Sequence, residues 1–361
     1  MKIVTVVGAR PQFIKAAAMS RVLRQSHTEV LVHTGQHYDP QMSGVFFSEL
    51  SIPTPDYDLG ISGGSHAQMT ARMLVAVEEV LLAEKPDALL VYGDTNSTLA
   101  AALAAAKLHV PVLHVEAGNR LGSLQNPEEV NRILTDHAAT MLFACVPSAL
   151  DALRRENLGD RAYLAGDPML DAFLYYRAQT GSRPPETLAG LSGEPVSIPN
   201  QFYYLTCHRE ENTRDDGALA QILLAMEALP YPTLYPVHPR NRDAALRLQK
   251  SLKLRNVLLL SPLGYLESVA LVSGAERVVT DSGGVQREAF FAGVPCVTVF
   301  DFAVWPETMV GGCNVLAKPQ ADDIAAKLLV DPIWPTADRP FGDGHACETI
   351  VRLIGEHFHS H

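Results

Sequence analysis

The stretch RVVTDSGGVQREAFF, residues 277–291, decides how this chain folds. It begins with a short apolar run over Arg277–Thr280, turns at Ser282-Gly283-Gly284 and continues into a pattern typical of a helix. A buried strand that feeds a helix through a glycine turn is the repeating unit of an α/β fold with a parallel sheet. We therefore expect this unit to recur along the chain.

Apolar, β-branched runs do alternate with longer helical patterns, such as Ile14–Arg24 and Thr98–Leu108. The predicted strands of the first half are Ile3–Val7, Glu29–Thr34, Ala88–Tyr92, Val112–Val115 and Met141–Ala144. Those of the second half are Tyr203–Thr206, Leu234–Val237, Val257–Leu260, Arg277–Thr280 and Cys296–Val299. Two such series in tandem predict two Rossmann-like, doubly wound domains.

The length of 361 residues fits two domains of about 150 to 200 residues each. We predict an N-terminal domain over residues 1–167 and a C-terminal domain over residues 168–344. The stretch Arg177–Asn200, with Gly, Ser and Pro throughout, is expected to be loop-rich and follows this boundary.

Composition and charge limit the classes of binding partner and the compartment that we expect. The net charge of −11 argues against a nucleic-acid or anionic-membrane surface, although a small anionic ligand needs only a few local cations. The five cysteines are scattered without a CxxC pair, which argues against a disulfide framework or a structural zinc site. The start of the sequence lacks the apolar stretch of a signal peptide, and no run approaches a membrane span. We expect a cytoplasmic protein.

Polar residues gather where the predicted strands end, and ligands of doubly wound sheets bind beyond these carboxyl ends. The ends are Gly8-Ala9-Arg10, Gly35-Gln36-His37, Gly93-Asp94, Glu116-Ala117-Gly118, His208-Arg209-Glu210, His238-Pro239-Arg240 and Asp281-Ser282-Gly283-Gly284. Seven such ends are hard to explain by solubility alone.

The turn Ser282-Gly283-Gly284 predicts an anion site, because free N–H groups at a helix start attract a phosphate and glycines let it approach. Glu288 lies about two turns into the helix and is a candidate acceptor for a ribose diol. The alternative is an ordinary glycine turn, since neither GxGxxG nor a P-loop occurs.

Two cations follow the first strand. Arg10 precedes a proline suited to a first helical turn, and Lys15 comes five residues later. Both are candidates to neutralise phosphate charge. From spacing alone, a solvated helical lysine is the alternative for Lys15.

Three carboxylates are candidates for acid–base chemistry. Asp94 and Glu116 end two strands that we expect to be close in space, and Glu128 follows in Pro127-Glu128-Glu129. The alternative for Glu128 is a first-turn acid that complements the helix dipole.

Histidines end two second-half strands. His208, beside Arg209, suits an electrophilic or phosphate-binding role, whereas His114 lies within an apolar strand and is expected to be buried and structural. No His, Asp and Glu set has recognisable metal spacing, so we expect no metal site. No GxSxG elbow supports a hydrolase triad.

Taken in order, the motifs resemble those of the non-hydrolysing UDP-N-acetylglucosamine 2-epimerases over nearly the whole length. The matching motifs are Gly8-Ala9-Arg10-Pro11, Gly93-Asp94-Thr95, His114-Val115-Glu116-Ala117-Gly118, Pro127-Glu128-Glu129-x-Asn131-Arg132, His208-Arg209, Asp281-Ser282-Gly283-Gly284-Val285-Gln286-x-Glu288 and Gly342-Asp343-Gly344-x-Ala346-Cys347.

The resemblance implies the GT-B architecture of nucleotide-sugar glycosyltransferases, with two domains facing a cleft and the last helix, 345–361, packing back on the first domain. It implies UDP binding by the second domain, a homodimer and no added cofactor. It also implies roles for eleven residues. The implied catalytic residues are Asp94, Glu116, Glu128 and His208, and the implied substrate-binding residues are Arg10, Lys15, Arg132, Ser282, Gly283, Gly284 and Glu288.

The implied reaction inverts carbon 2 of a UDP-N-acetylhexosamine by anti elimination of UDP and its re-addition to a bound glycal. Within the family, the chain is most similar to the subgroup acting on UDP-2,3-diacetamido-2,3-dideoxy-glucuronate, through stretches such as 33–39 (HTGQHYD) and Pro55-Asp56-Tyr57. The stretch Phe300–Glu307 departs from the family, which usually has Arg-Asp at its start. Either this uronate or UDP-N-acetylglucosamine therefore remains a candidate substrate. A hydrolysing epimerase and a UDP-sugar glycosyltransferase remain alternative functions.

Overall fold

A computed structural model of the chain describes residues 1–36, 47, 49–180, 184–335 and 339–359. The chain divides into two compact units. Unit 1 comprises Met1–Leu174 and Arg339–His361, and unit 2 comprises Tyr175–Asp338. Both are α/β units with a parallel sheet, which confirms the predicted fold class of two Rossmann-like domains.

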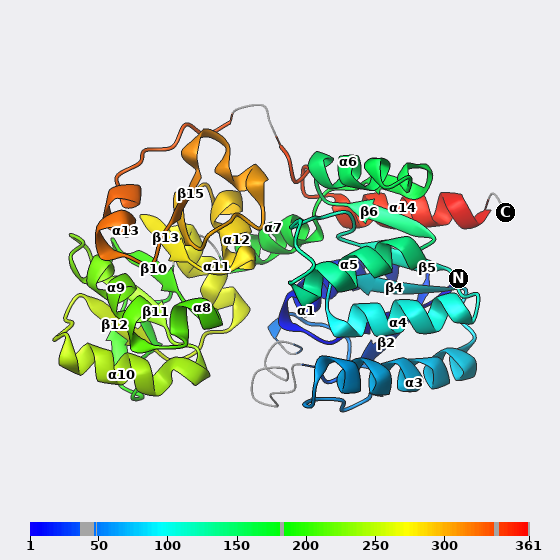
Figure 1. The fold of residues 1–361 in the computed structure, drawn as a ribbon, viewed down its shortest axis with the longest axis horizontal. Helices are drawn as coiled ribbons and strands as arrows, with labels where there is room; N and C mark the ends of the chain where they lie inside the picture. The colour runs from blue at the N-terminus through cyan, green and yellow to red at the C-terminus, as the bar shows by residue number, and fades with distance from the viewer. Residues whose placement is uncertain (37–46, 48, 181–183, 336–338, 360–361) are drawn as a thin grey trace. The chain divides into compact units, whose positions relative to one another are not determined.

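The sheet of unit 1 has seven strands in the order β3-β2-β1-β4-β5-β6-β7, and every neighbouring pair is parallel (Figure 1). The strands are β1 (Lys2–Val7), β2 (Thr28–His33), β3 (Tyr57–Asp58), β4 (Ala88–Tyr92), β5 (Val112–Val115), β6 (Met141–Ala144) and β7 (Ala162–Leu164). The central strands are buried on both sides, as near-continuous apolar sequences require.

Helices cover both faces of this sheet. They are α1 (Arg10–Leu23), α3 (His66–Glu84), α4 (Asn96–Lys107), α5 (Pro127–Ala138), α6 (Pro147–Arg155), α7 (Pro168–Thr180) and α14 (Ala346–His359), with a 3-10 turn η1 (Gly159–Arg161). Because crossovers between parallel strands are right-handed, α1 and α4 lie on opposite faces. Helices α3, α4 and α5 pack in a row, while the last helix α14 packs against α1.

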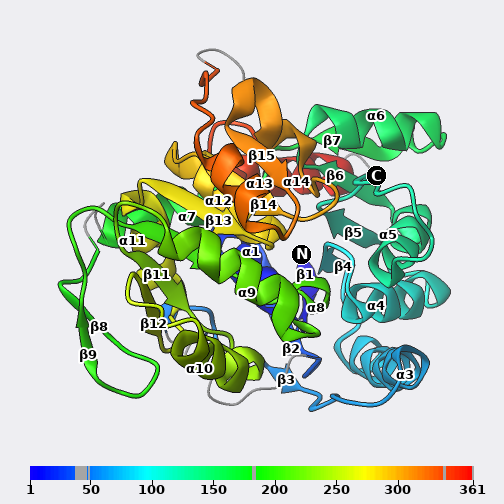
Figure 2. The ribbon, with the colours of Figure 1, turned by 60° about the vertical axis from the view of Figure 1, so that its left-hand side comes forward.

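Unit 2 repeats this order with β12-β11-β10-β13-β14-β15, again all parallel. Its strands are β10 (Tyr203–Thr206), β11 (Thr233–Pro236), β12 (Val257–Leu260), β13 (Arg277–Thr280), β14 (Cys296–Val299) and β15 (Asn314–Ala317). A separate antiparallel hairpin pairs β8 (Thr187–Ala189) with β9 (Pro195–Ser197) and projects from the unit in Figure 2.

The helices of unit 2 are α8 (Glu210–Thr213), α9 (Asp216–Glu227), α10 (Arg242–Ser251), α11 (Tyr265–Gly274), α12 (Gly283–Ala292) and α13 (Ala321–Leu328), with 3-10 turns η2 (Pro239–Asn241) and η3 (Pro306–Gly312). Successive strand residues face opposite sides of the sheet. Leu205 and Val279 join a core beneath α9, α10 and α13, whereas Tyr204 and Val278 join a core beneath α11 and α12.

In each unit the strand order reverses at one point, between β1 and β4 in unit 1 and between β10 and β13 in unit 2. Loops diverge there and leave a crevice for a ligand. The turn after β1 is tightly constrained, because a Cβ on Gly8 would lie 2.2 Å from both Ser97 Oγ and Thr34 Oγ1. Buried Gln12 joins the two loops, accepting the Gly8 N–H and donating to the Tyr92 carbonyl, each over 2.8 Å.

The predicted strands of both halves are confirmed to within one residue at either end. The short edge strands β3, β7 and β15 were not predicted from the sequence. The stretch Arg177–Asn200, expected to be loop-rich, instead contains the end of α7 and the β8–β9 hairpin. The edge strand β7 and the hairpin strands β8 and β9 are short and partly exposed, so they lack the apolar runs that mark central strands.

Among the residues that the structure describes, no helix is long and apolar enough to cross a membrane.

Candidate active site

The first cluster of charges in unit 1 joins α1 to the end of β5. Lys15, expected from spacing alone to be either functional or solvated, is 2% exposed and forms an ion pair with Glu116. Glu116 has a left-handed backbone, with φ of 67°, a conformation that is uncommon for a residue other than glycine. Gly93 lies beside the pair, since a Cβ there would be 3.6 Å from Glu116 Oε1 and 3.8 Å from Lys15 Nζ. Burial rules out the solvated alternative for Lys15.

The second cluster surrounds Asp94, which follows β4. The register pairs Tyr92 of β4 with Val115 of β5, so Asp94 and Glu116 follow neighbouring strands as predicted. Buried Arg132, from α5, forms an ion pair with Asp94 and donates to Glu129 Oε2 over 2.6 Å.

These carboxylates set the charge state of Arg132. Burial alone would lower its pKa, but the negative charges of Asp94, Glu129 and Glu116 outweigh burial and raise the pKa of the guanidinium. Arg132 therefore stays charged, and the two carboxylates that end β4 and β5 are each held by a buried cation.

The two glutamates at the start of α5 differ. Glu129 is 1% exposed and accepts the N–H groups of Leu121 and Gly122 over 2.9 and 3.0 Å. Glu128 is exposed in the first turn of the helix, where its backbone N–H donates to the Asn126 side chain that caps the helix. The structure thus places Glu129 inside the charge cluster, and the catalytic role of Glu128 stays a prediction.

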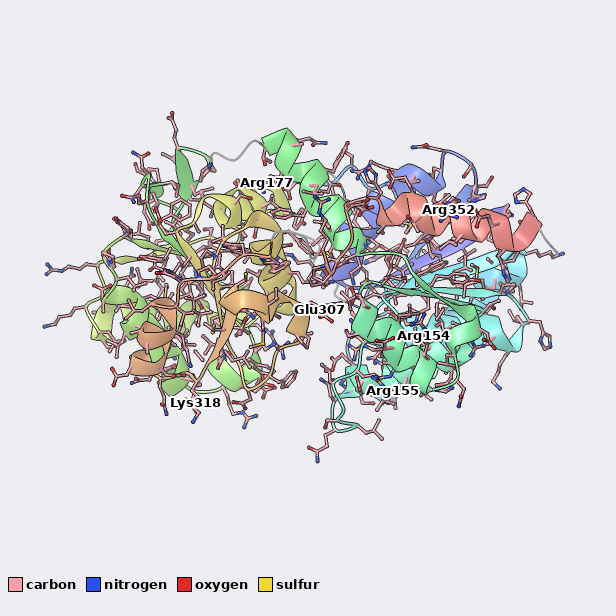
Figure 3. The ribbon with its side chains drawn as sticks, turned by 90° about the horizontal axis from the view of Figure 1, so that it is seen from above. Arg154, Arg155, Arg177, Glu307, Lys318 and Arg352 are labelled. Carbon is pink, nitrogen blue, oxygen red and sulfur yellow. The ribbon has the colours of Figure 1, made fainter. Side chains whose placement is uncertain are left out.

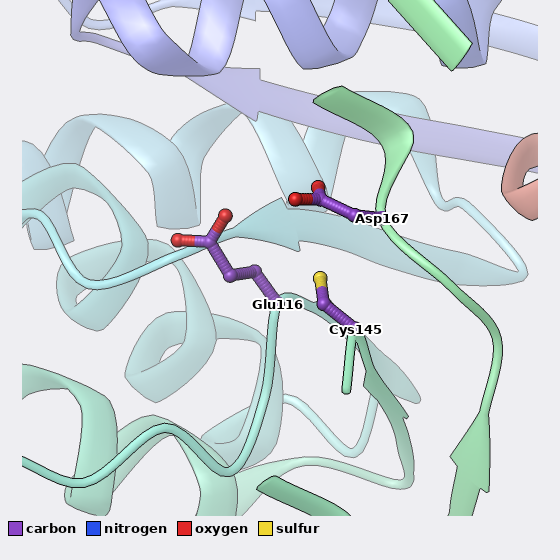
Figure 4. Close-up of side chains that lie close together, drawn as sticks. All are labelled: Glu116, Cys145 and Asp167. Atoms are coloured by element: carbon purple, nitrogen blue, oxygen red, sulfur yellow. The ribbon is translucent and has the colours of Figure 1, made fainter. Parts of the chain in front are cut away.

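Three further groups lie at the ends of β5, β6 and β7. The ligand-type atoms of Glu116, Cys145 and Asp167 are within 4.8 Å of one another, and Figure 4 shows the thiol pointing between the two carboxylates. Asp167 is fully buried and also accepts the Met169 N–H over 2.9 Å at the start of α7. A divalent ion needs such donors, but the ammonium of Lys15 already engages Glu116 and opposes a second cation there.

A buried histidine supports the same sheet edge. His114 Nδ1 lies 2.7 Å from Asp136 Oδ1, and Nε2 lies 2.7 Å from the Gly93 carbonyl. Burial would raise the pKa of Asp136, but His114 and Arg120 outweigh it and lower that pKa. His114 is therefore the buried, structural histidine that the sequence predicts, and it fixes the loop that carries Asp94.

Exposed ion pairs of unit 1 offer a contrast. Figure 3 shows Arg154 and Arg352 on the ribbon, and their partners Asp151 and Glu356 lie one turn away on the same helix, at 3.1 and 2.7 Å. More than half of each of these side chains is exposed. Such pairs contribute at most about 1 kcal/mol.

In unit 2 the register pairs Thr206 with Thr280, so the loops after β10 and β13 start level with each other. His208 Nδ1 lies 3.1 Å from Asp281 Oδ1, and its side chain is 40% exposed while that of Asp281 is 1% exposed. The His208 and His238 rings stack with centroids 6.2 Å apart. His208 is therefore held on one side and accessible on the other.

The predicted anion site lies at the start of α12. Ser282 caps this helix by accepting the Val285 N–H over 3.4 Å, and Gly283 and Gly284 form its first residues. Val304 packs against the turn, since a Cβ on Gly283 would lie 3.3 Å from it. Glu288, two turns on, is buried. The turn thus has the helix start and glycines that an anion requires.

The stretch that departs from the family, Phe300–Glu307, is held by two cation–π contacts. The Arg209 guanidinium lies 4.2 Å from the centroid of the Phe300 ring, and that of buried Arg287 lies 4.0 Å from Trp305. The Phe300 ring thus gives Arg209 a fixed orientation.

A pocket of about 570 Å³ lies elsewhere in unit 1, lined by residues of α3, α4 and α5 that include His66, Asn96 and Asn131. None of the predicted site residues lines it. It borders the acid cluster through Asn131, which donates to the Asp94 carbonyl over 3.0 Å.

The remaining predicted cation, Arg10, lies half-buried at the start of α1.

Sequence reasoning assigned no role of their own to several residues of these clusters, namely Gln12, Glu129, Asn131, Asp136, Asp167 and Asp281, although Glu129, Asn131 and Asp281 lie within the quoted motifs. Their contacts are with segments distant in the sequence. A polar residue among apolar helix positions was the available signal for Gln12. The buried residues of α5, which include Asp136, are all polar and offer no such contrast. The stretch 37–39 of the subgroup motif lies outside the described residues.

Comparison with known proteins places these features in a family. The family profile described as UDP-N-acetylglucosamine 2-epimerase matches residues 21–355. UDP-2,3-diacetamido-2,3-dideoxy-D-glucuronate 2-epimerase of Pseudomonas aeruginosa is 44% identical over 368 residues, covering 99% of this chain and 100% of the relative. UDP-N-acetylglucosamine 2-epimerase of Methanocaldococcus jannaschii is 36% identical over 367 residues, covering 98% and 99%.

Solved structures agree. The crystal structure of the Methanocaldococcus jannaschii UDP-GlcNAc 2-epimerase in complex with UDP-GlcNAc and UDP matches with a TM-score of 0.84 at 34% identity, covering 99% of this chain and 100% of that one. That of the Neisseria meningitidis enzyme bound to UDP-GlcNAc matches with a TM-score of 0.83 at 28% identity, covering 99% and 100%. The resemblance seen in the motifs is confirmed: the chain belongs to the UDP-N-acetylglucosamine 2-epimerase family and is an epimerase.

Proposed function

We propose that this epimerase inverts carbon 2 of a UDP-linked N-acetyl sugar without hydrolysing it. One observation carries the proposal: Asp94 and Glu116 follow neighbouring strands, and each is held by a buried cation of its own. Acid–base chemistry on two faces of a carbon requires two such groups in fixed positions. We assign Asp94, Glu116, Glu128 and His208 as the catalytic group.

Carbon 2 of the sugar is not adjacent to a carbonyl, so simple deprotonation would leave its charge unstabilised. In the proposed route a base removes the carbon 2 proton while the bond from carbon 1 to the diphosphate oxygen breaks. UDP departs with the bonding electrons and leaves a glycal. UDP then adds back to carbon 1, and an acid returns a proton to the opposite face of carbon 2. Charged and amide donors stabilise the departing UDP.

In this proposal, residues of unit 2 bind the UDP moiety. Ser282, Gly283 and Gly284 start α12, and the backbone N–H groups of the two glycines suit the diphosphate, while the Ser282 N–H donates to Thr280 Oγ1 over 2.9 Å. Buried Glu288 suits the ribose diol. We assign Arg10, Lys15 and Arg132 of unit 1 as further substrate-binding cations. Lys15 and Arg132 also keep the catalytic carboxylates in place through their ion pairs.

We propose UDP-2,3-diacetamido-2,3-dideoxy-glucuronate as the preferred substrate. The relative named for this sugar is 44% identical, against 36% for the methanogen UDP-N-acetylglucosamine 2-epimerase. UDP-N-acetylglucosamine is the second candidate, favoured by the TM-score of 0.84 to a structure that holds it.

Incubation of each UDP-sugar in deuterated water tests the reaction and the substrate together. The preferred substrate should gain one deuterium at carbon 2 and form its manno epimer, and Glu116→Gln should lower this exchange about 1,000-fold, within the usual range for acid–base groups. The exposed Glu356→Gln is the matched control and should exchange at the wild-type rate.

The rival functions give different products. Stoichiometric release of UDP with a free N-acetyl sugar would identify a hydrolysing epimerase. Sugar transfer to an acceptor without exchange at carbon 2 would identify a glycosyltransferase. Absence of exchange with both UDP-sugars would refute the proposed reaction.

We further propose a cytoplasmic homodimer. Apolar side chains that are about half exposed, Val75 and Leu82 on α3 and Leu134 on α5, support an association surface on unit 1. All five cysteines are buried and none forms a disulfide, which suits a reducing compartment. Light scattering coupled to size exclusion should give twice the chain mass of 39.2 kDa, and a mass of one chain would refute the dimer.

A further inference from the structure

The buried carboxylate of Asp281 gathers the loop that follows β10. Asp281 Oδ2 accepts the backbone N–H groups of His208 and Arg209, each over 2.9 Å, and the side-chain amide of Asn212 over 3.3 Å. The other oxygen, Oδ1, lies 3.1 Å from His208 Nδ1. One carboxylate thus holds both the backbone and the ring of His208.

This loop is also anchored from its other side. The Cys207 carbonyl accepts bonds from the Asn241 side chain over 3.0 Å and from the Tyr235 hydroxyl over 3.3 Å, and Asn212 donates to the Val299 carbonyl over 3.0 Å. The backbone position of His208 is therefore set independently of its ring. What Asp281 adds is the orientation and hydrogen placement of the imidazole.

The charge on Asp281 decides which ring nitrogen carries hydrogen. Burial would raise the pKa of this carboxyl, but its bonds to His208 and Arg209 outweigh burial and lower the pKa. An ionised carboxylate only accepts, so Nδ1 must donate to it. Nε2 is then the nitrogen without hydrogen, on a side chain that is 40% exposed. The His208 ring stacks on the ring of His238, and the neighbouring Arg209 guanidinium lies over the Phe300 ring.

We propose that Asp281 is a positioning residue of the epimerase, which holds His208 in the Nδ1–H state and so presents Nε2 to the diphosphate of the UDP-sugar. The inference rests on the catalytic role proposed for His208. It assigns the Asp281 carboxylate a function distinct from that of the neighbouring Ser282-Gly283-Gly284 turn. Serine-protease triads use a carboxylate in the same way, and exchanging it for an amide lowers kcat about 10,000-fold there through the wrong tautomer.

Asp281→Asn is a selective test because Oδ1 lies 3.1 Å from the His208 ring, whereas the His208 N–H, shared by both oxygens, is nearer to Oδ2, at 2.9 Å against 3.1 Å. Its amide oxygen can remain at the Oδ2 position and keep the His208, Arg209 and Asn212 donors. Its NH₂ group then faces Nδ1 and donates to it, which moves the ring hydrogen to Nε2. The loop is retained and the histidine tautomer is reversed.

The matched control is Asp171→Asn in unit 1. Asp171 is also a buried carboxylate that accepts two backbone N–H groups, from Ala346 and Cys347 over 3.1 and 2.8 Å, but its described bonds involve no histidine. The substitution in the control removes one hydrogen bond from a backbone N–H and leaves the His208 tautomer unchanged.

The experiment uses ¹⁵N-histidine-labelled full-length protein, with His208 assigned by its loss in His208→Gln. Wild-type protein should show hydrogen on Nδ1 of neutral His208, and Asp281→Asn should show it on Nε2. With the UDP-sugar that turns over, Asp281→Asn should lower kcat about 100-fold or more and change KM less than threefold. Asp171→Asn should keep kcat within threefold of wild type.

Two results would overturn the proposal: hydrogen on Nε2 in the wild-type protein, or a kcat loss in Asp281→Asn no larger than in Asp171→Asn. The wild-type spectrum decides the tautomer even where Asp281→Asn fails to fold. It also decides it where neither UDP-sugar turns over, so failure of the proposed reaction is distinguishable from failure of this inference.

Discussion

Each unit holds a histidine against a buried aspartate near the carboxyl end of its sheet, yet the two pairs differ in what the second ring nitrogen does. In unit 1, His114 is fully buried and its nitrogens contact Asp136 and the Gly93 carbonyl. In unit 2, His208 contacts Asp281 through Nδ1, and its side chain is 40% exposed. The carboxylate is common to both, so it does not distinguish a structural from a reactive histidine.

The difference follows from the surroundings of each ring. Both ring nitrogens of His114 lie 2.7 Å from protein oxygens, so neither is available to a ligand. His208 contacts Asp281 through Nδ1 and stacks on the His238 ring, and 40% of its side chain is exposed. The lesson is that availability of the second nitrogen, rather than the presence of an Asp partner, marks a histidine for chemistry.

The charges around the two pairs differ as well. Unit 1 concentrates full charges, with Lys15 and Arg132 each joined to a carboxylate. Unit 2 instead offers a helix start with glycines at α12. In the reaction that we propose, unit 1 would carry out proton transfer and unit 2 would bind the anion.

The largest expected effect tests the open pair. His208→Gln should lower kcat about 1,000-fold, because an accessible acid–base or anion-binding group is lost. Its free energy of unfolding should fall by about 1 kcal/mol, because buried Asp281 loses one hydrogen-bond partner and keeps its backbone and Asn212 donors. Steady-state kinetics and urea unfolding check both, with the exposed His345→Gln as control. Full activity in His208→Gln would show that His208 has no role in the reaction and does not differ from His114 in this respect.

The next effect tests the closed pair. His114→Gln leaves Asp136 buried with one fewer partner and should lower the free energy of unfolding by about 3 kcal/mol, as breaking a buried ion pair does. Trp305 and Trp334 both lie in unit 2, so tryptophan fluorescence follows that unit while circular dichroism follows both. The urea midpoint should fall more by circular dichroism than by fluorescence. A loss below 1 kcal/mol would show that this histidine is not structural.

The smallest effect is a difference in pH dependence. The pKa of Asp136 is lowered in the folded protein, so its stabilisation is present above the unfolded value of 3.8 and is lost as the pH falls through the folded pKa. Asp136→Asn should therefore show a flatter acid limb than wild type in denaturant unfolding between pH 7 and 3. Asp281 in unit 2 has the same direction of shift, so Asp281→Asn should behave alike.

Asp171 provides the opposite sign for the same measurement. Burial outweighs its bonds to the Cys347 and Ala346 amides and raises the pKa of Asp171. Its favourable contribution is present below pH 3.8 and is lost as the pH rises through the folded pKa. Asp171→Asn should therefore lose less stability than wild type as the pH rises through this range. Equal slopes for Asp136→Asn and Asp171→Asn would contradict the assignment.

Much of the fold and part of the site could be predicted from the sequence. Central strands such as Ala88–Tyr92 and Arg277–Thr280 were correct because burial on both faces demands continuous apolar runs. Asp94 and Glu116 were expected to be neighbours because parallel strands end at one edge. The β8–β9 hairpin was missed, since its short, exposed strands have no such pattern.

The amino-acid sequence by itself determined the two Rossmann-like sheets, the family and the residues at the strand ends, because these depend on local periodicity and chain order. Only the tertiary structure decided the charge partners. It buried Lys15 against Glu116 and placed Glu129 inside the charge cluster while leaving Glu128 exposed. It also buried the His114 ring completely, whereas the His208 side chain remains 40% exposed. The physical reason is that burial and hydrogen-bond partners are properties of contacts between segments distant in the sequence, which no local pattern encodes.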